Sequence, residues 1–307
     1  MKFVIAPDSF KGSLTAKEVG IAMKKGITKI YPESNVELVP MADGGEGTVQ
    51  ALTDATNGRF IKKEVMGPLG SVVDAVYGIL GDNSTAVIEM SAASGIQFVN
   101  ENTHNPLKTT TYGTGELILD AIEHGVKKII LGIGGSATND GGAGMAQALG
   151  VKLLDSNNCE LPLGGGELYK LDRIDMSKIN TRVPKTKILI ASDVTNPLVG
   201  KNGASVIFGP QKGATPDMVA ELDNDLAHYA DIIAKELGTK LKDLPGAGAA
   251  GGLGAGLLAF TNARMEKGID IVVKYSQLKE KAKDADFVLL VRVELITKLN
   301  MGKPLMG

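Results

Sequence analysis

The glycines of this chain lie in a few short clusters instead of being spread evenly along it. The clusters read MADGGEGT, GIGGSATNDGGAGM, LGGGE and GAGAAGGLGAG. Each adjoins a pattern typical of a strand or a helix, where glycine allows a positive φ or a close approach of backbone to a ligand. This placement disfavours a low-complexity linker, and it predicts ligand-binding loops at the ends of regular elements.

The first half of the chain alternates strand and helix patterns. Residues 2–6 (KFVIA) predict a buried strand, and a helix is expected from Thr15, which forms a capping box with Glu18. Residues 35–40 (NVELVP) predict a second strand, followed by a helix over residues 46–55. This order is typical of a parallel sheet whose loops meet at its carboxyl edge.

Three strand patterns then follow in quick succession over residues 59–90, as in a mixed or antiparallel sheet, before helix and strand patterns alternate again. A long helix is predicted from Pro216 to about Leu237, and FVLLV predicts a last strand. The fold class is therefore α/β in two lobes, one with a parallel and one with a mixed sheet. The boundary is expected near residues 85–95, and the last strand is expected to return to the first lobe.

Composition excludes several classes of protein. The net charge is −2 with acids and bases interspersed, so neither nucleic acid nor a membrane surface is an expected partner. The single cysteine, Cys159, cannot form an internal disulfide and fits a reducing compartment. The first residues are too weakly apolar for a signal peptide, and no run is long enough to span a membrane. We therefore expect a cytoplasmic protein.

The stretch KKIILGIGGSATNDGGAGM is the most specific candidate site. A strand, a glycine turn and the start of a helix present free amides to an anion. Gly132, Gly134 and Ala137 also fit G-x-G-x-x-A, with Asp155 at the end of the next strand, so an NAD-binding oxidoreductase stays open. The acidic Asp140 fits phosphates accompanied by Mg²⁺ better than it fits NAD.

Further polar residues follow other predicted strands, where α/β sheets bind ligands. Lysines can neutralise a phosphate or a carboxylate, and an aspartate after a strand can act as a base or bind a metal. Each of these residues could instead be a turn former or a helix cap. The candidates in these loops are Asp8, Ser9, Lys11, Asp43, Glu46, Ser91, Ser94, Thr109, Thr111, Asp193, Asn196 and Lys212.

Taken together, the loops resemble those of the bacterial glycerate kinase family that lacks a P-loop. The motifs are APDSFKGS, ADGGEGT, NPLKTTTYGTGELI, GIGGSATNDGGAGMAQALG, SDVTNPLVGKNGASVIFGPQKGAT and PGAGAAGGLGAG, in this order, over nearly the whole chain. The resemblance implies phosphoryl transfer from ATP, with Mg²⁺, to D-glycerate. The implied product is 2-phosphoglycerate, with 3-phosphoglycerate as the alternative. A homodimer is left open.

The resemblance also implies an architecture. A discontinuous Rossmann-like or flavodoxin-like lobe would comprise residues 1–88 and 284–307, with residues 89–283 inserted as the second lobe. Within it, the 136–144 loop is expected to hold the ATP phosphates, and Asp140 or Asp193 the Mg²⁺. The expected nucleotide- and substrate-binding residues are Asp8, Ser9, Glu46, Ser91, Ser94, Thr109, Thr111, Gly134, Gly135, Ser136, Thr138, Asn139, Gly141 and Asn196. The expected catalytic residues are Lys11, Asp43, Asp193 and Lys212, with Asp193 or else Asp43 as the base.

The last residues depart from the family pattern. After DADFV the family continues I-T-G-E-G-R-x-D-x-Q-T, whereas this chain reads LLVRVELITKLNMGKPLMG. One added nucleotide after codon 288 can restore the family motif, which suggests a one-nucleotide deletion followed by early termination. On this hypothesis the first lobe is incomplete and the chain has little or no kinase activity. A non-catalytic remnant or binding module is therefore a third reading.

Overall fold

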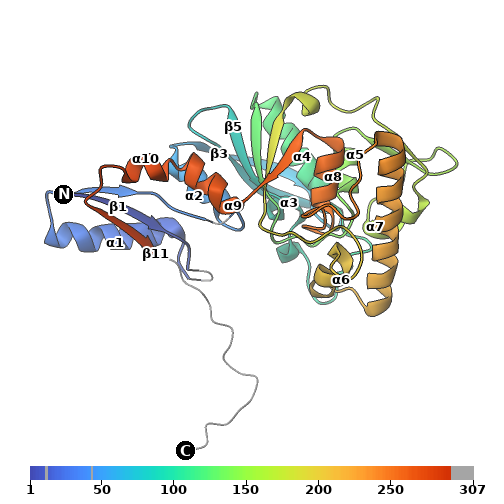
Figure 1. The fold of residues 1–307 in the computed structure, drawn as a ribbon, viewed down its shortest axis with the longest axis horizontal. Helices are drawn as coiled ribbons and strands as arrows, with labels where there is room; N and C mark the ends of the chain where they lie inside the picture. The colour runs from blue at the N-terminus through green and yellow to red at the C-terminus, as the bar shows by residue number, and fades with distance from the viewer. Residues whose placement is uncertain (11–12, 43, 292–307) are drawn as a thin grey trace, which may run out of the picture.

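A computed structural model describes residues 1–10, 13–42 and 44–291, and its strands form two main sheets (Figure 1). The smaller sheet is entirely parallel, in the order β11-β1-β2. Its strands are β1 (Lys2–Pro7), β2 (Asn35–Leu38) and β11 (Phe287–Val291). The predicted return of the last strand to the first lobe is thus confirmed.

The larger sheet has six strands in the order β10-β9-β6-β5-β4-β3. β3 and β4 are antiparallel, and β5, β6, β9 and β10 are parallel to one another, so the predicted mixed sheet is confirmed. Its strands are β3 (Arg59–Met66), β4 (Val72–Ile79), β5 (Thr85–Glu89), β6 (Lys128–Gly132), β9 (Lys187–Ala191) and β10 (Ala263–Glu266). A separate antiparallel pair is formed by β7 (Lys152–Leu154) and β8 (Arg173–Asp175).

The strands over residues 59–89, which we expected in the first lobe, pair with the second sheet. β5 pairs with β6 along its whole length, and β4 is hydrogen-bonded to β5. Strand pairing therefore does not follow the expected division at residue 88. The alternating pattern of these strands shows that they lie in a sheet, but not which other strands they pair with.

Helices cover both sheets, and two of them lie between the lobes (Figure 1). α2 (Thr48–Ala55) and α9 (Gly268–Tyr275) join side chains of both sheets in one apolar cluster that includes Val4, Leu52, Ile130 and Ile271. The other helices are α1 (Ala16–Ile30), α3 (Ser91–Ser94), α4 (Tyr112–Glu123), α5 (Ala143–Ala148), α6 (Ala204–Phe208), α7 (Pro216–Leu237), α8 (Leu253–Phe260) and α10 (Leu278–Ala282). Short 3-10 turns occupy residues 96–98, 165–170, 183–185 and 210–212.

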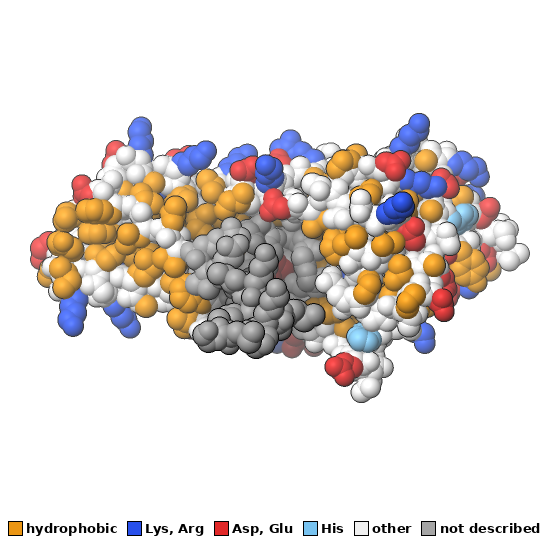
Figure 2. Space-filling view, turned by 60° about the horizontal axis from the view of Figure 1, so that its bottom comes forward, with side chains coloured by type: hydrophobic (Ala, Val, Ile, Leu, Met, Phe, Trp, Pro, Cys, Tyr) orange, Lys and Arg blue, Asp and Glu red, His pale blue; other side chains and the backbone are white. Residues whose placement is uncertain are grey.

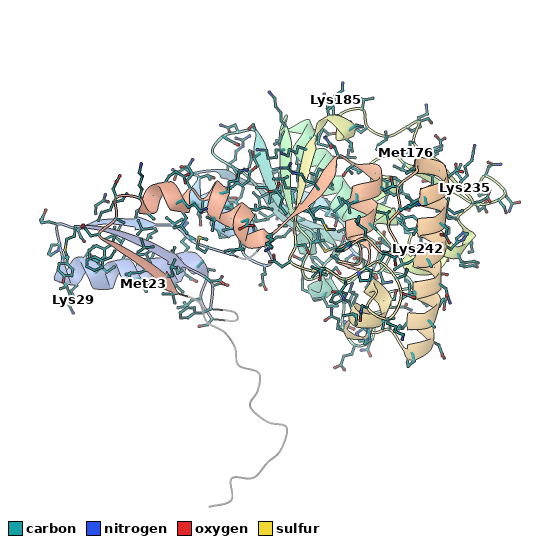
Figure 3. All side chains as sticks on the ribbon, viewed as in Figure 1. Met23, Lys29, Met176, Lys185, Lys235 and Lys242 are labelled. Carbon is teal, nitrogen blue, oxygen red and sulfur yellow. The ribbon has the colours of Figure 1, made fainter. Side chains whose placement is uncertain are left out.

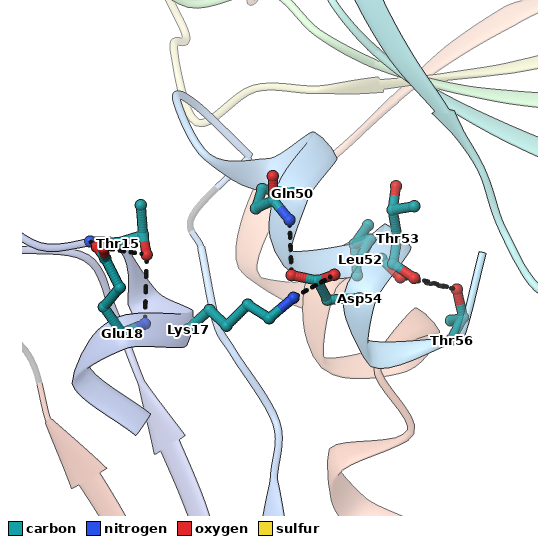
Figure 4. Close-up of polar contacts among 8 residues, drawn as sticks. All are labelled: Thr15, Lys17, Glu18, Gln50, Leu52, Thr53, Asp54 and Thr56. Atoms are coloured by element: carbon teal, nitrogen blue, oxygen red, sulfur yellow. Dashed lines mark hydrogen bonds and ion pairs between the residues drawn. The ribbon is translucent and has the colours of Figure 1, made fainter. Parts of the chain in front are cut away.

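The start of α1 follows the sequence prediction. The Thr15 hydroxyl accepts the backbone N–H of Glu18, and the Glu18 carboxylate accepts that of Thr15, which forms the predicted capping box (Figure 4). Lys17 of the same turn pairs with Asp54 of α2 at 3.1 Å. α1 is thereby fixed both to its own loop and to the helix between the lobes.

The apolar face of α1 covers the smaller sheet. Met23 packs against the cluster of Phe3, Ile5 and Val36, and Lys29 lies at the outer end of the helix (Figure 3). Apolar side chains also gather on the surface of this lobe (Figure 2), where Ile30 is 69% and Leu290 of β11 is 71% exposed. β11 pairs only with β1 among the described strands, so it is an edge strand with an apolar surface.

Candidate active site

A pocket of about 440 Å³ lies at the carboxyl ends of β6 and β9, where the parallel strands were expected to place their loops. Three turns form much of its wall: residues 133–136 after β6, residues 192–194 after β9, and Gly44 and Gly45 after β2. The rest of the wall comes from Ile96, Ala191, Phe208, Gln211, Lys212, Ala249 and Ala250. We call this cavity the main pocket.

Lys212 is a buried cation in the wall of this pocket. Its side chain is only 2% exposed, and its Nζ donates to the Ser136 hydroxyl at 2.7 Å and to the Thr138 carbonyl at 2.5 Å. Burial lowers the pKa of this amine to about 7, and the negative charge of Asp140 opposes that shift. No carboxylate of the described residues forms an ion pair with Lys212, so an anion in the pocket would meet an uncompensated charge.

Asp193 supplies a free carboxylate to the same pocket. It lies in the turn after β9, its side chain is exposed, and it has no hydrogen bond or ion pair within the described part of the chain. Its neighbour Asn196 instead supports the loop, because its amide donates to the carbonyl of Asn202 at 2.9 Å. Of these two candidates, Asp193 alone lines the pocket.

Asp140 is a structural residue, which corrects the expectation that it binds Mg²⁺. Its carboxylate is fully buried and accepts backbone N–H groups of Thr111, Gly142 and Gly144 together with the Thr111 hydroxyl at 2.8 Å. Burial is the main cause that raises its pKa. Since both oxygens accept hydrogen bonds from the loop, Asp140 fixes the start of α5, and this buried carboxylate does not line the main pocket.

Asp140→Asn is expected to lower the free energy of unfolding by about 2–4 kcal/mol, because an amide NH₂ would face buried N–H donors. Urea unfolding would measure the loss, with Asp172→Asn on the surface as a matched control. A variant as stable as the parent would contradict the structural role.

The other polar candidates of the second lobe are engaged in hydrogen bonds around residues 136–139. The Thr109 hydroxyl donates to the Ala137 carbonyl at 2.9 Å, and the Asn139 amide donates to Ser205 at 2.9 Å. Ser94 shares a hydrogen bond of 2.9 Å with Thr114, which lies inside α4. Thr109, Thr111, Ser94, Thr138 and Asn139 are all buried.

Some candidates of the first lobe line a smaller cavity, and Asp8 forms a turn. Ser9 and Glu46 line a smaller pocket of about 230 Å³, together with Ser13 and Gln50. Asp8 accepts the backbone N–H of Ser9 at 2.7 Å, as a turn former does. The 44–47 loop contributes to both cavities. Lys11 and Asp43 lie outside the described residues.

Of the remaining candidates, Gly134, Gly135 and Ser136 line the main pocket, as expected. Ser91 lies behind this turn, since a Cβ added at Gly135 would lie 3.3 Å from the Ser91 Cβ. Gly141 is enclosed by the rings and side chains of Tyr229 and Leu226 and does not reach the pocket wall. The segment from Gly134 to Gly141 thus faces the pocket at its beginning and is packed inside the protein at its end.

Glu89 supports the start of α2 next to the 44–47 loop, and it was not among the expected binding or catalytic residues. It ends β5, and its carboxylate accepts the backbone N–H of Val49 at 2.9 Å, which fixes the start of α2 behind the 44–47 loop. Burial, as the largest cause, raises its pKa, and the nearby Glu46 adds to the shift. The sequence signal that could have identified Glu89 is its position directly after a run of buried strand residues.

Gly44→Ala is expected to destabilise the protein by about 3 kcal/mol, because Gly44 has φ +93° and its added Cβ would lie 2.7 Å from the Gly268 Cα. Gly47→Ala is the matched control, because φ is +88° there but a Cβ would meet open space. For Gly47→Ala we expect a loss of only about 1 kcal/mol. Equal losses in urea unfolding would show that the contact with α9 is unimportant.

Comparison with known proteins finds relatives that match most of the chain. The model of the Glycerate kinase family matches residues 3–294. The chain is 53% identical over 304 residues to a glycerate kinase of Halalkalibacterium halodurans, covering 99% of this chain and 80% of that protein. It is 55% identical over 289 residues to the glycerate 2-kinase of Escherichia coli K12, covering 94% and 76% of the two chains.

A solved structure extends the agreement to the fold. The crystal structure of a glycerate kinase 2 from Salmonella typhimurium LT2 is 51% identical in sequence and superposes with a TM-score of 0.94, over 97% of this chain and 80% of that one. In the described part of the chain, no helix has the length and apolar character needed to cross a membrane. The α/β fold predicted from the sequence is confirmed, and this chain belongs to the glycerate kinase family.

Proposed function

We propose that this enzyme transfers a phosphoryl group from ATP to the C2 hydroxyl of D-glycerate, giving 2-phosphoglycerate and ADP. The main observation behind the proposal is that a free carboxylate, Asp193, and a buried cation, Lys212, line one pocket with the 134–136 glycine turn. Phosphoryl transfer depends mainly on alignment and on cations that stabilise the developing charge. The choice of C2 follows the name of the relative from Escherichia coli.

In this mechanism the 134–136 turn and Lys212 bind the phosphates. The turn contributes the backbone amides of Gly134 and Gly135. Lys212 contributes a positive charge whose position is fixed by its hydrogen bonds to Ser136 and Thr138. The carboxylate of Asp193 accepts the proton of the C2 hydroxyl as that oxygen bonds to the γ-phosphorus and the bond to ADP breaks. Both groups approach the ligand from the walls of a single cavity.

The described residues fit Mg²⁺ only in combination with a nucleotide. They contain no group of three or more His, Cys, Asp or Glu side chains arranged to hold a metal ion. Mg²⁺ is usually bound by one or two carboxylates plus substrate phosphates, and Asp193 is the one described carboxylate that lines the main pocket. Asp193 and the ATP phosphates would therefore hold the ion, which would neutralise phosphate charge.

The NAD-binding alternative loses its main support. Asp155, the expected ribose ligand, accepts the backbone N–H groups of Asn157 and Cys159 at 2.8 Å in its own turn and does not line the main pocket. We therefore expect no saturable change in NADH fluorescence when the protein is added. Saturable binding that ATP displaces would revive the oxidoreductase reading.

The departure from the family pattern after Val288 is also part of the proposal. A frame-restored gene would encode a Gly-Glu-Gly-Arg segment that this chain lacks, and we expect it to produce more glycerate-dependent ADP release than the present chain. The DNA of codons 288–290 tests the deletion directly, because codons incompatible with the restored frame would exclude it. Formation of 3-phosphoglycerate, roles of Lys11 and Asp43 in catalysis, a cytoplasmic location and a homodimer also remain predictions.

A further inference from the structure

A second large cavity, of about 540 Å³, lies apart from the main pocket, against α2, α9 and α10. We call it the α2–α9 pocket. None of the residues that line it contributes to the main pocket. Its walls are Glu37, Ala55, Thr56, Asn57, Leu80, Gly81, Asp82, Lys128, Lys274, Tyr275, Gln277 and Lys281.

Two lysines in this pocket have no acidic partner among the residues that the structure describes. The Nζ atoms of Lys128 and Lys274 lie 5.1 and 5.7 Å from the centre of the Tyr275 ring, and neither forms an ion pair with any residue that the structure describes. Two ammonium groups held beside one ring repel each other. This arrangement favours a bound anion, which would reduce that repulsion.

The carboxylates of the pocket are already engaged. Glu37 pairs with Lys281 at 3.8 Å and with Lys2 at 3.9 Å. Asp82 accepts the backbone N–H groups of Ser84 and Thr85 and the Thr85 hydroxyl, which closes its own turn. These contacts leave the charges of Lys128 and Lys274 uncompensated.

Contacts with helix ends account for only some of the lysines in this pocket. The carbonyl ends of α2 and α9 carry partial negative charge. Lys281 donates to the Ala55 carbonyl at 3.2 Å at the end of α2, and Lys274 lies in the last turn of α9. Lys128 begins β6 and belongs to neither helix.

The backbone of Gln277, which also lines the pocket, has φ +57°, and this conformation is strained for a residue other than glycine.

The two helices connect the α2–α9 pocket to the main pocket. α2 begins after Gly47, beside the 44–47 loop, and ends at Ala55 in the α2–α9 pocket. α9 begins at Gly268, which packs against Gly44, and ends at Tyr275. A ligand that moved the carboxyl ends of these helices would therefore act on the 44–47 loop of the main pocket.

We propose that the α2–α9 pocket is a regulatory site for a small phosphate-bearing anion, bound by Lys128 and Lys274. The anion would fix the ends of α2 and α9 and thereby order the 44–47 loop. This proposal does not depend on the kinase activity of the chain, since both binding and loop order can be measured without turnover.

Pyrophosphate is the probe, and Tyr275→Trp is the reporter, because the chain contains no tryptophan. An indole keeps an aromatic ring near both lysines. We expect a saturable change in its fluorescence on titration with pyrophosphate. The added changes Lys128→Gln and Lys274→Gln should weaken binding at least tenfold, whereas Lys127→Gln with Lys279→Gln, neighbouring surface lysines, should not.

Other outcomes would overturn the site. One is the absence of a saturable fluorescence change in the Tyr275→Trp protein. Another is an equal affinity for pyrophosphate once Lys128→Gln and Lys274→Gln are added. The third is loss of the signal on Lys212→Met, which would place the ligand in the main pocket. If the two lysines serve only the helix ends, their removal lowers stability while pyrophosphate gives no signal in the parent.

Hydrogen exchange tests the connection between the pockets. We expect saturating pyrophosphate to slow exchange of amides 44–49 at least threefold in the Tyr275→Trp protein, and less than 1.5-fold once Lys128 and Lys274 are also replaced. Protection that persists without the two lysines would arise from the main pocket and would contradict the coupling.

Discussion

Asp193→Asn is expected to lower kcat for glycerate phosphorylation by about 10²–10⁴-fold, the usual effect of removing a general base. The amide keeps the size of the side chain but cannot accept the hydroxyl proton. Because the carboxylate is exposed and has no partner among the described residues, the fold should not depend on it. A coupled ADP-release assay measures the effect, on the frame-restored protein if the present chain turns over too slowly.

The control for this variant is Asp243→Asn, an exposed aspartate away from the main pocket. It should retain the parent's kcat, and both variants should unfold at the parent's midpoint in urea. Near-normal turnover of Asp193→Asn would remove Asp193 as the base, and Asp43 would then be the remaining candidate.

Lys212→Met is expected to weaken ATP binding at least 100-fold, since it removes the one cation that lines the main pocket among the described residues. An anion beside Lys212 raises the lowered pKa of its amine again. ATP binding at pH 8.5 should therefore take up a proton, which calorimetry in buffers of different ionisation enthalpy detects. The Lys212→Met protein should show no such uptake.

The same lysine predicts a dependence of stability on pH. Its pKa is about 7 in the folded protein and ordinarily 10.5. Between these values the unfolded chain holds a proton that the folded protein has lost, so the free energy of unfolding should rise with pH, by up to about 1.4 kcal/mol per unit. Relative to Lys212→Met, the parent should gain stability from pH 7 to pH 10. A flat difference would contradict the lowered pKa of this amine.

Sequence patterns predicted the elements of this fold better than their partners. The capping box at Thr15, the helix over residues 216–237 and the return of the last strand were all predicted and are present. Local periodicity determines such features. The pairing of β5 with β6 was not predicted, because it joins strands separated by α3, α4 and the long loop between them.

The same limit applies to the candidate site. Glycine clusters after strands identified the turn of Gly134, Gly135 and Ser136, because the φ of +73° at Gly135 favours glycine. They could not distinguish Asp193, which faces the pocket, from Asp140, which lies beneath the loop and binds its amides. Both are acidic residues in loops that follow strands. Only the packing of Thr111 and α5 around Asp140 separates the two roles.

The most direct test of the account follows ATP and D-glycerate by phosphorus NMR, with the present chain and with the frame-restored protein. We expect glycerate-dependent growth of the 2-phosphoglycerate resonance together with ADP in at least the frame-restored protein, and its loss on Asp193→Asn in that protein. A 3-phosphoglycerate resonance would correct the position of transfer. No glycerate-dependent product from either protein would contradict the proposed reaction.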